Sequence, residues 1–256
     1  MKRFILFIFL LGFVSTGLAH EVGVENTQYI GGLGLITREG PTGMFLNPTS
    51  GVQPKGALVP QFCVAVNPLE GQDNHRVSYG FILVYGVLDW LDVGFQGLIT
   101  EPDSNTNFTS FGAQTRARIL KDEGMIPEWS VGAYFREGDD PITSQNIYTA
   151  LSKGFILHEG VYLNSIRFHL GARHEWHEVL DDRPVGYVGG EIELYPRLHF
   201  VGEVVTKDDD VEEHIPYSFG IQVRHPGRFG FSLAGIQPGN NKHLGVYIGV
   251  GISFLL

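Results

Sequence analysis

The chain has 256 residues and carries 28 acidic against 18 basic side chains, which gives a formal net charge of −10 at neutral pH. An acidic chain is a poor partner for nucleic acid, because binding to that polyanion depends on Lys and Arg, so we expect no nucleic-acid partner. The single cysteine, Cys63, excludes an internal disulfide framework. The 34 glycines and the length suit one large all-β domain.

The first 19 residues have the pattern of a secretory signal peptide. Lys2 and Arg3 form a basic head, an apolar run follows from Phe4 to Val14, and a stretch of small residues ends at Ala19. The alternative is a membrane anchor, but the apolar run is shorter than the roughly 20 residues that a spanning helix needs. We therefore predict that residues 1–19 are a signal peptide, cleaved during export.

Residues 20–56 form an irregular segment that is rich in Gly and Pro. Pro41, Pro48 and Pro54 exclude a long regular strand, although one short strand fits residues 33–37. We predict a compact segment that plugs or lines a barrel lumen, or that closes the periplasmic end of the barrel. An ordinary loop-rich N-terminus is the alternative.

Strands begin at Ala57, so we predict that residues 57–256 form a β-barrel. Between Arg76 and Thr100, apolar residues recur at every second position on both sides of a turn that holds Gly86 and Asp89, which is the period of a strand. Similar alternation predicts twelve strands, at residues 57–67, 76–86, 91–100, 108–120, 127–137, 145–157, 161–175, 185–195, 197–206, 215–224, 228–236 and 244–254. This even number and these lengths are typical of an all-β, up-and-down antiparallel transmembrane β-barrel.

The connections between the predicted strands alternate between short and long. The short ones fit periplasmic turns, and the long ones fit outer loops. The long connections hold many of the acidic residues, namely Asp139, Asp140, Asp181, Asp182, Asp208, Asp209, Asp210, Glu212 and Glu213. These acids form either an ordinary solvated surface or a rim that attracts cations and shares divalent ions with lipopolysaccharide.

The polar face of the strands contains Gly, Ser and Gln with isolated charges, and it lacks the dense Lys and Glu of a solvated sheet. If the apolar face meets lipid, these charges must point inward, because an Arg or Lys that faces the middle of the bilayer costs about 2–4 kcal/mol. The predicted lumen-lining residues are Gln96, Gln114, Arg116, Arg118, Tyr134, Arg136, Arg167, His169, Arg173, Glu191, Glu193, His199, Glu203, Gln222 and Arg224. The arginines of this set lie on one arc of the wall and the glutamates on the next arc. This arrangement predicts an electric field across the lumen that selects polar solutes. The alternative is a barrel that these same residues fill with salt bridges.

The sequence gives only weak signals for a metal-binding motif and for a hydrolase motif. The RHEWHE stretch places His174 and His177 three residues apart, which puts them on opposite faces of a strand and does not match the helical zinc motif. The sequence has no Gly-x-Ser-x-Gly elbow, and nothing in it fixes a nucleophile beside a base. We therefore expect no catalytic residue, no metal site and no cofactor, and a hydrolase at the barrel rim is the third hypothesis.

Two stretches resemble known proteins. The hairpin from Tyr85 to Gly97, YGVLDWLDVGFQG, resembles those of bacterial outer-membrane barrels. The stretch from Gly32 to Leu58, GLGLITREGPTGMFLNPTSGVQPKGAL, resembles the opening of YjbH-type outer-membrane proteins, in which Gly-Leu-Ile, Pro-Thr and Pro-x-Gly patterns precede the first barrel strand. This second resemblance implies an association with exopolysaccharide production and carries over no catalytic residues.

The pattern as a whole predicts an outer-membrane barrel with a narrow polar pore for passive transport of small solutes or ions. The main alternative is a non-conducting structural or accessory protein that serves exopolysaccharide export or envelope integrity. The expected partners are outer-membrane lipid and lipopolysaccharide, the envelope barrel-assembly machinery, and either small polar solutes or exopolysaccharide.

Overall fold

The computed structural model describes residues 43–68, 75–101, 108–138, 144–157, 163–177, 182–194, 197–209, 212–224, 229–239 and 243–256. The predicted signal peptide and the first part of the predicted N-terminal segment, including the short strand near residues 33–37, lie outside these ranges. The described residues contain no helix long and apolar enough to cross a membrane.

Twelve long strands follow one another along the chain, and a two-residue strand follows the last of them. They are β1 (Ala57–Pro68), β2 (His75–Leu88), β3 (Leu91–Glu101), β4 (Phe108–Leu120), β5 (Glu128–Gly138), β6 (Ser144–Ile156), β7 (Leu163–His177), β8 (Arg183–Leu194), β9 (Leu198–Val205), β10 (Tyr217–Arg224), β11 (Phe229–Gln237), β12 (Gly245–Ile252) and β13 (Phe254–Leu255). The predicted strands are confirmed, and their predicted boundaries lie within about two residues of the observed ones, as is usual for element ends.

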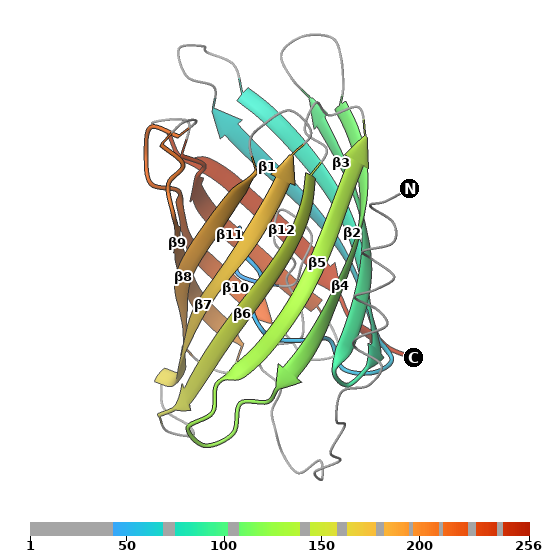
Figure 1. Cartoon of the computed structure of the whole chain (residues 1–256), viewed down its shortest axis with the longest axis vertical. Helices are drawn as coiled ribbons and strands as arrows, with labels where there is room; N and C mark the ends of the chain where they lie inside the picture. The colour runs from blue at the N-terminus through green and yellow to red at the C-terminus, as the bar shows by residue number, and fades with distance from the viewer. Residues whose placement is uncertain are drawn as a thin grey trace.

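Each strand is antiparallel to the next one along the chain, and β12 pairs with β1 to close the sheet into a barrel (Figure 1). At this closing seam Val64 pairs with Ile248. Beyond Ser253, β13 pairs with Ala57 and Leu58 and so prolongs the seam. The fold is therefore an up-and-down antiparallel barrel of twelve strands.

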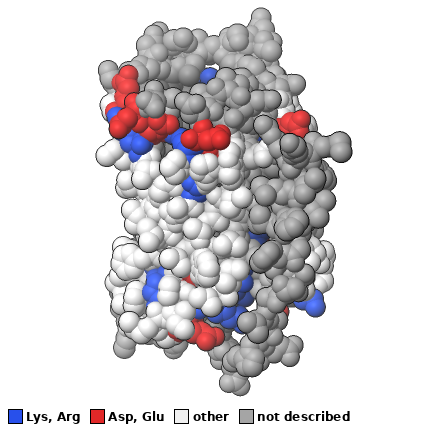
Figure 2. Space-filling view, viewed as in Figure 1, with Lys and Arg blue, Asp and Glu red and all other residues white. Residues whose placement is uncertain are grey.

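Alternation along each strand separates an outward apolar face from an inward, more polar face. In β12, the side chains of Val246, Ile248, Val250 and Ile252 are 42–47% exposed, whereas the residues between them are buried. Strand residues alternate in this way because successive Cβ atoms point to opposite sides of the sheet. Figure 2 shows the result on one side of the molecule, where charged side chains gather toward the two ends and the band between them is mostly uncharged.

The entry to β1 and the end of the chain lie at the same end of the barrel as the short connections. Gly56 N–H donates to the Gly86 carbonyl, and Leu256 N–H donates to the Gly56 carbonyl. The two-residue connection between β2 and β3 is therefore beside the seam. Residues 121–127, between β4 and β5, form a second short connection at this end, with a β-bridge of its own.

Candidate functional site: the interior of the barrel

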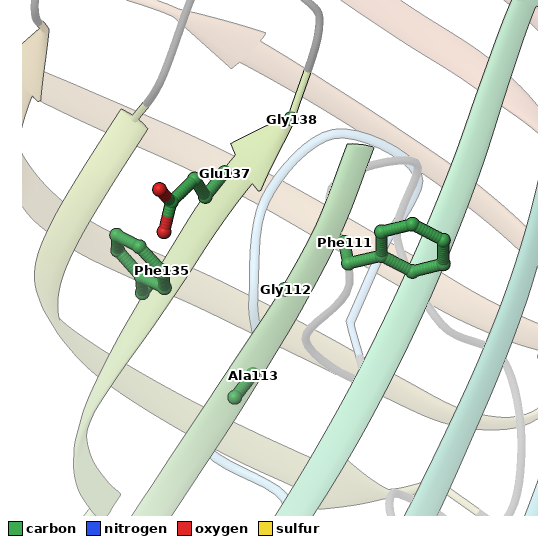
Figure 3. A pocket seen from close by; sticks show the side chains of 6 residues that line it. All are labelled: Phe111, Gly112, Ala113, Phe135, Glu137 and Gly138. Carbon is green, nitrogen blue, oxygen red and sulfur yellow. The ribbon is translucent and has the colours of Figure 1, made fainter. Parts of the chain in front are cut away.

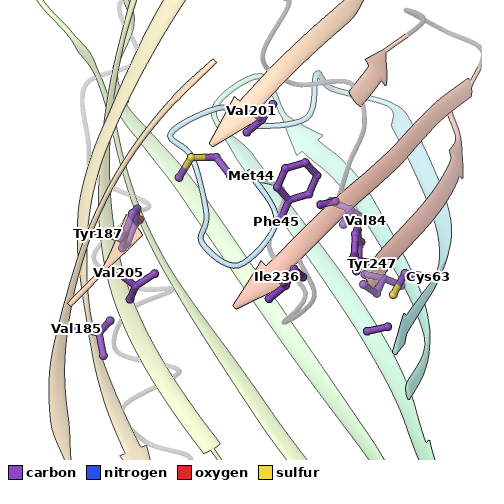
Figure 4. Packing of buried hydrophobic residues seen from close by; sticks show 13 residues of the cluster. Met44, Phe45, Cys63, Val84, Val185, Tyr187, Val201, Val205, Ile236 and Tyr247 are labelled. Atoms are coloured by element: carbon purple, nitrogen blue, oxygen red, sulfur yellow. The ribbon is translucent and has the colours of Figure 1, made fainter. Parts of the chain in front are cut away.

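The space inside the barrel holds a stretch of the same chain. Residues 43–56, which we call the inner segment, run from the interior of the barrel to β1, and residues 43–53 lie inside it, whereas Lys55 is exposed (Figure 1, Figure 4). Met44, Phe45, Asn47 and Ser50 are 0% exposed, although they belong to no strand of the barrel. Most of the described part of the predicted N-terminal segment is therefore enclosed by the barrel.

The inner segment contains a tight turn that packs against apolar residues of the wall. Met44 N–H donates to the Asn47 carbonyl over 3.0 Å. Phe45 lies edge-on to Tyr247, and their ring centroids are 6.2 Å apart. The apolar wall residues in the same buried cluster include Ile82, Val84, Val201 and Ile236 (Figure 4). Burial of Met44 and Phe45 in this cluster gives the turn a hydrophobic anchor.

The carboxylate of Glu203 on β9 is the main polar anchor of the turn. It accepts the backbone N–H groups of Phe45, Leu46 and Asn47 at 2.9, 2.7 and 3.1 Å. It also accepts the side-chain amide of Asn47 at 2.8 Å and the hydroxyl of Ser218 at 2.6 Å. Glu203 is 3% exposed, and a buried carboxylate needs donors because burying it unpaired is costly. Four of these five donors come from the inner segment.

Side chains from seven further strands hold the rest of the inner segment. Asp92 accepts the N–H of Gln53 at 2.9 Å, and Arg116 donates to the Thr49 carbonyl at 3.2 Å. The other contacts join Gln222 to the Met44 carbonyl, Arg173 to the Asn47 side chain, Tyr187 to the Pro48 carbonyl, Ser152 to the Ser50 N–H and Glu128 to the Ser50 hydroxyl. The inner segment is thus tied to every strand from β3 to β10.

Glycines in the wall make room for the inner segment at two places. A Cβ atom on Gly86 of β2 would overlap with the Pro54 carbonyl. A Cβ atom on Gly189 of β8 would overlap with the sulfur of Met44. At Gly86 the neighbour is backbone, and only glycine allows the backbone of the inner segment to approach the strand this closely. At Gly189 the neighbour is the flexible side chain of Met44.

No protein-family model matches the chain, and a search of curated proteins finds no match either. Solved structures are similar in fold. The KdgM porin has a TM-score of 0.55 at 9% identity, over 77% of this chain and 99% of that one. The COG4313 outer membrane channel from Pseudomonas putida F1 has a TM-score of 0.53 at 12% identity, over 91% of this chain and 100% of that one. This chain has the fold of an outer-membrane β-barrel.

The fifteen predicted lumen-lining residues of this outer-membrane barrel fold all lie in strands. Gln114, Arg116, Arg118, Tyr134, His169, Arg173, Glu191, Glu193, His199, Glu203, Gln222 and Arg224 are buried, and Gln96, Arg136 and Arg167 are partly buried. Four of them, Arg116, Arg173, Glu203 and Gln222, contact the inner segment directly. That these residues line a passage remains a prediction.

Ion pairs occupy much of the remaining interior. Arg116 binds Asp92 at 2.6 Å, and Arg224 binds Glu191 at 2.7 Å. Further pairs join Arg118 to Glu128, Arg173 to Glu175 and Arg183 to Glu175. The prediction of separate basic and acidic arcs is wrong, because Asp92, Glu128 and Glu175 face inward among the arginines. These three acids are absent from the predicted lumen-lining set, although their strand parity marks them as inward.

The predicted loop acids are only partly within the described residues. Asp182, Asp208, Asp209, Glu212 and Glu213 are described, whereas Asp139, Asp140, Asp181 and Asp210 lie outside the described ranges. Asp208 and Glu212 accept from Arg183 at 3.1 and 3.5 Å. These two acids are therefore tied to the start of β8, and they are not isolated charges in solvent.

One serine and one histidine approach each other in the interior. The Oγ of Ser152 lies 2.7 Å from Nδ1 of His169, whose Nε2 lies 4.0 Å from the Glu191 carboxylate. Ser152 is 1% exposed and also accepts the N–H of Ser50 from the inner segment. Arg224 binds the same carboxylate, and the buried Ser152 hydroxyl is not accessible to a substrate while the inner segment occupies the interior. Within the described residues, no three His, Cys, Asp or Glu side chains are grouped as a metal site requires.

Two hollows lie on the outward surface of the barrel. The smaller one, of about 440 Å³, lies between β4 and β5 beside Phe111 and Phe135 (Figure 3). The larger one, of about 860 Å³, crosses β7 to β11 beside Phe168, Phe200 and Phe219. Their linings are mainly apolar, so they belong to the outward apolar surface, and the interior remains the candidate site.

Proposed function

We propose that this protein is a bacterial outer-membrane channel for small polar solutes, and that the inner segment keeps it closed. The observation that carries the proposal is the interior itself, which encloses residues 43–53 within a polar wall. Eight strands leave a filled interior and sixteen leave an aqueous channel, so twelve strands suit a narrow passage. Movement of the inner segment out of the barrel would leave such a passage. The likeness in fold to a porin and to a channel supports this proposal.

The outward apolar face supports a place in the outer membrane, and it can be tested at the middle of β7. Leu170 is 56% exposed there. We expect Leu170→Arg to lower the free energy of unfolding by about 2–4 kcal/mol, measured by urea unfolding in phospholipid vesicles. Leu157→Arg, just beyond the end of β6, is the matched control and should cost about 0–1 kcal/mol near the membrane interface. Equal losses at the two positions would contradict the membrane placement.

A reversible cross-link between the inner segment and the wall tests the channel. In a chain that carries Cys63→Ala, the changes Ser50→Cys and Ser152→Cys place two thiols where the Ser50 N–H meets the Ser152 hydroxyl at 3.3 Å. We expect the oxidised protein to be silent in planar bilayers and reduction to restore its openings, because the segment can leave only when it is free.

Mass spectrometry first establishes that the cross-link has formed, since a disulfide needs a narrow range of Cα separations. The single variant Ser50→Cys, in the same Cys63→Ala chain, is the control and should not respond to oxidant. A variant that lacks residues 20–53 should conduct without gating. If this deletion variant folds but stays silent, the channel proposal is wrong.

A non-conducting accessory barrel is the second candidate. The buried ion pairs and the occupied interior favour it, because together they leave the described barrel well filled. The resemblance of residues 32–58 to YjbH-type proteins supports a role beside exopolysaccharide export. Binding of exopolysaccharide to the folded, silent protein, lost on deletion of residues 20–53, is the result that would favour this candidate.

A further inference from the structure

The hydrogen bonds between the wall of the barrel and the inner segment involve mainly the peptide backbone of the segment. Five backbone N–H groups of the segment donate to wall side chains, those of Phe45, Leu46, Asn47, Ser50 and Gln53. Three backbone carbonyls accept from wall side chains, those of Met44, Pro48 and Thr49. Side-chain hydrogen bonds to the wall come from Asn47 and Ser50. Most of these hydrogen bonds are therefore independent of which side chains the segment carries.

The wall offers both kinds of group that an amide chain requires. Glu203 and Asp92 present carboxylates, which accept N–H groups. Arg116, Tyr187 and Gln222 donate to carbonyl oxygens. A ligand that matches this set has N–H donors and C=O acceptors in series, as a peptide has. The terminal ammonium and carboxylate of a free peptide suit the same carboxylates and donors.

Departure of the inner segment changes the surroundings of Glu203 most. Four of its five donors leave with the segment, and Ser218 remains at 2.6 Å. Water in the emptied passage or a ligand that supplies N–H groups then takes the place of these donors. The notch at Gly189 can accept a side chain of such a ligand, as it accepts the sulfur of Met44.

We infer that the interior of the barrel is a binding site for peptide backbone, and that short peptides are the class of solute that passes through it. This inference rests on the proposed channel function, in which the inner segment leaves the interior. The inner segment is then an internal competitor for the site. An entering peptide replaces its hydrogen bonds to Glu203, Asp92 and Arg116.

The test measures binding separately from conduction. A fluorescein-labelled synthetic peptide with the sequence of residues 43–53 is titrated with the folded variant that lacks residues 20–53, and its fluorescence anisotropy is recorded. We expect saturable binding, and at least about tenfold weaker binding to the full chain, whose inner segment competes. A peptide with N-methyl groups on the amides of Phe45, Leu46 and Asn47 should bind at least about 30-fold more weakly, because three hydrogen bonds to one charged acceptor are lost.

Two controls define the class of ligand. A peptide in which Asn47 and Ser50 are replaced by Ala loses three side-chain hydrogen bonds and should bind more weakly than the original, but its binding should remain saturable because the backbone contacts remain. A linear glucose oligosaccharide of similar length should not displace the labelled peptide. Equal binding of the N-methylated peptide, displacement by the oligosaccharide, or absence of peptide binding to the folded variant would each overturn the inference.

The two proposals fail in different ways. If the deletion variant conducts but binds no peptide, the channel proposal stands and the inference of a peptide site is wrong. If the deletion variant binds peptide but never conducts, the peptide site stands and the channel proposal is wrong. If deletion prevents folding, the full chain with Phe45→Asp serves instead, because a carboxylate at this 0% exposed position expels the turn from its apolar cluster. The same peptide titrations with this Phe45→Asp variant then test whether the interior binds peptide backbone.

Discussion

We expect Glu203→Gln to release the inner segment and to raise the fraction of time spent in the conducting state by about 100-fold. The carboxylate of Glu203 accepts five hydrogen bonds, whereas an amide replaces one of its oxygens by an NH₂ group, which only donates. At least one N–H of the turn then meets a donor. Each lost hydrogen bond to a charged acceptor costs about 1.5–3 kcal/mol, so one or two losses suffice for this shift. Single-channel recording in planar bilayers measures the fraction directly.

Glu193→Gln is the matched control for this prediction. Glu193 is also buried, at 6% exposed, and it accepts from the Ser165 hydroxyl and from the Arg197 N–H. These contacts lie within the wall and its turn, away from the inner segment. We expect this variant to lose stability while its conductance stays at the wild-type value. Equal conductance changes in the two variants, or none in a folded Glu203→Gln protein, would show that Glu203 does not hold the segment.

The strands of the barrel could be predicted from sequence because their chemistry repeats every two residues. In β12 the outward positions are Val or Ile and the inward positions are Gly or Tyr, so the period identifies both the strand and its faces. The order of the strands in the sheet could be predicted from the up-and-down pattern of alternating short and long connections. The seam between β1 and β12 is the long-range pairing, and the even number of strands already implied it.

The contacts inside the barrel could not be predicted in the same way. Periodicity tells which face Glu203 lies on, but it gives neither its height in the barrel nor its partner. The decisive bonds join Asn47 to Glu203 across 156 positions of sequence. The turn at Met44 has no period of its own, because it packs as a single loop. The Gly and Pro content of residues 20–56 therefore predicted an irregular segment and left its position open.

We expect Arg116→Met to lower the free energy of unfolding by about 3–5 kcal/mol, because it leaves the Asp92 carboxylate buried without its cation. The two side chains are 2% and 3% exposed, and their ion pair is 2.6 Å long. Asp92→Leu should have a loss of similar size. In the double variant both charges are gone, and such replacements are often close to neutral. Urea unfolding of the three variants measures the coupling as a double-mutant cycle.

Conductance separates the role of this ion pair in the wall from its role toward the inner segment. Arg116 donates to the Thr49 carbonyl, and Asp92 accepts the Gln53 N–H, so either substitution removes one tie to the segment and the double variant removes both. We therefore expect the double variant to recover most of its stability and yet to open at least as often as either single variant. A double variant as unstable as the sum of the two single ones would show that the two charges do not interact in the wall. A double variant that is stable and stays closed would show that the wall holds the segment without this pair.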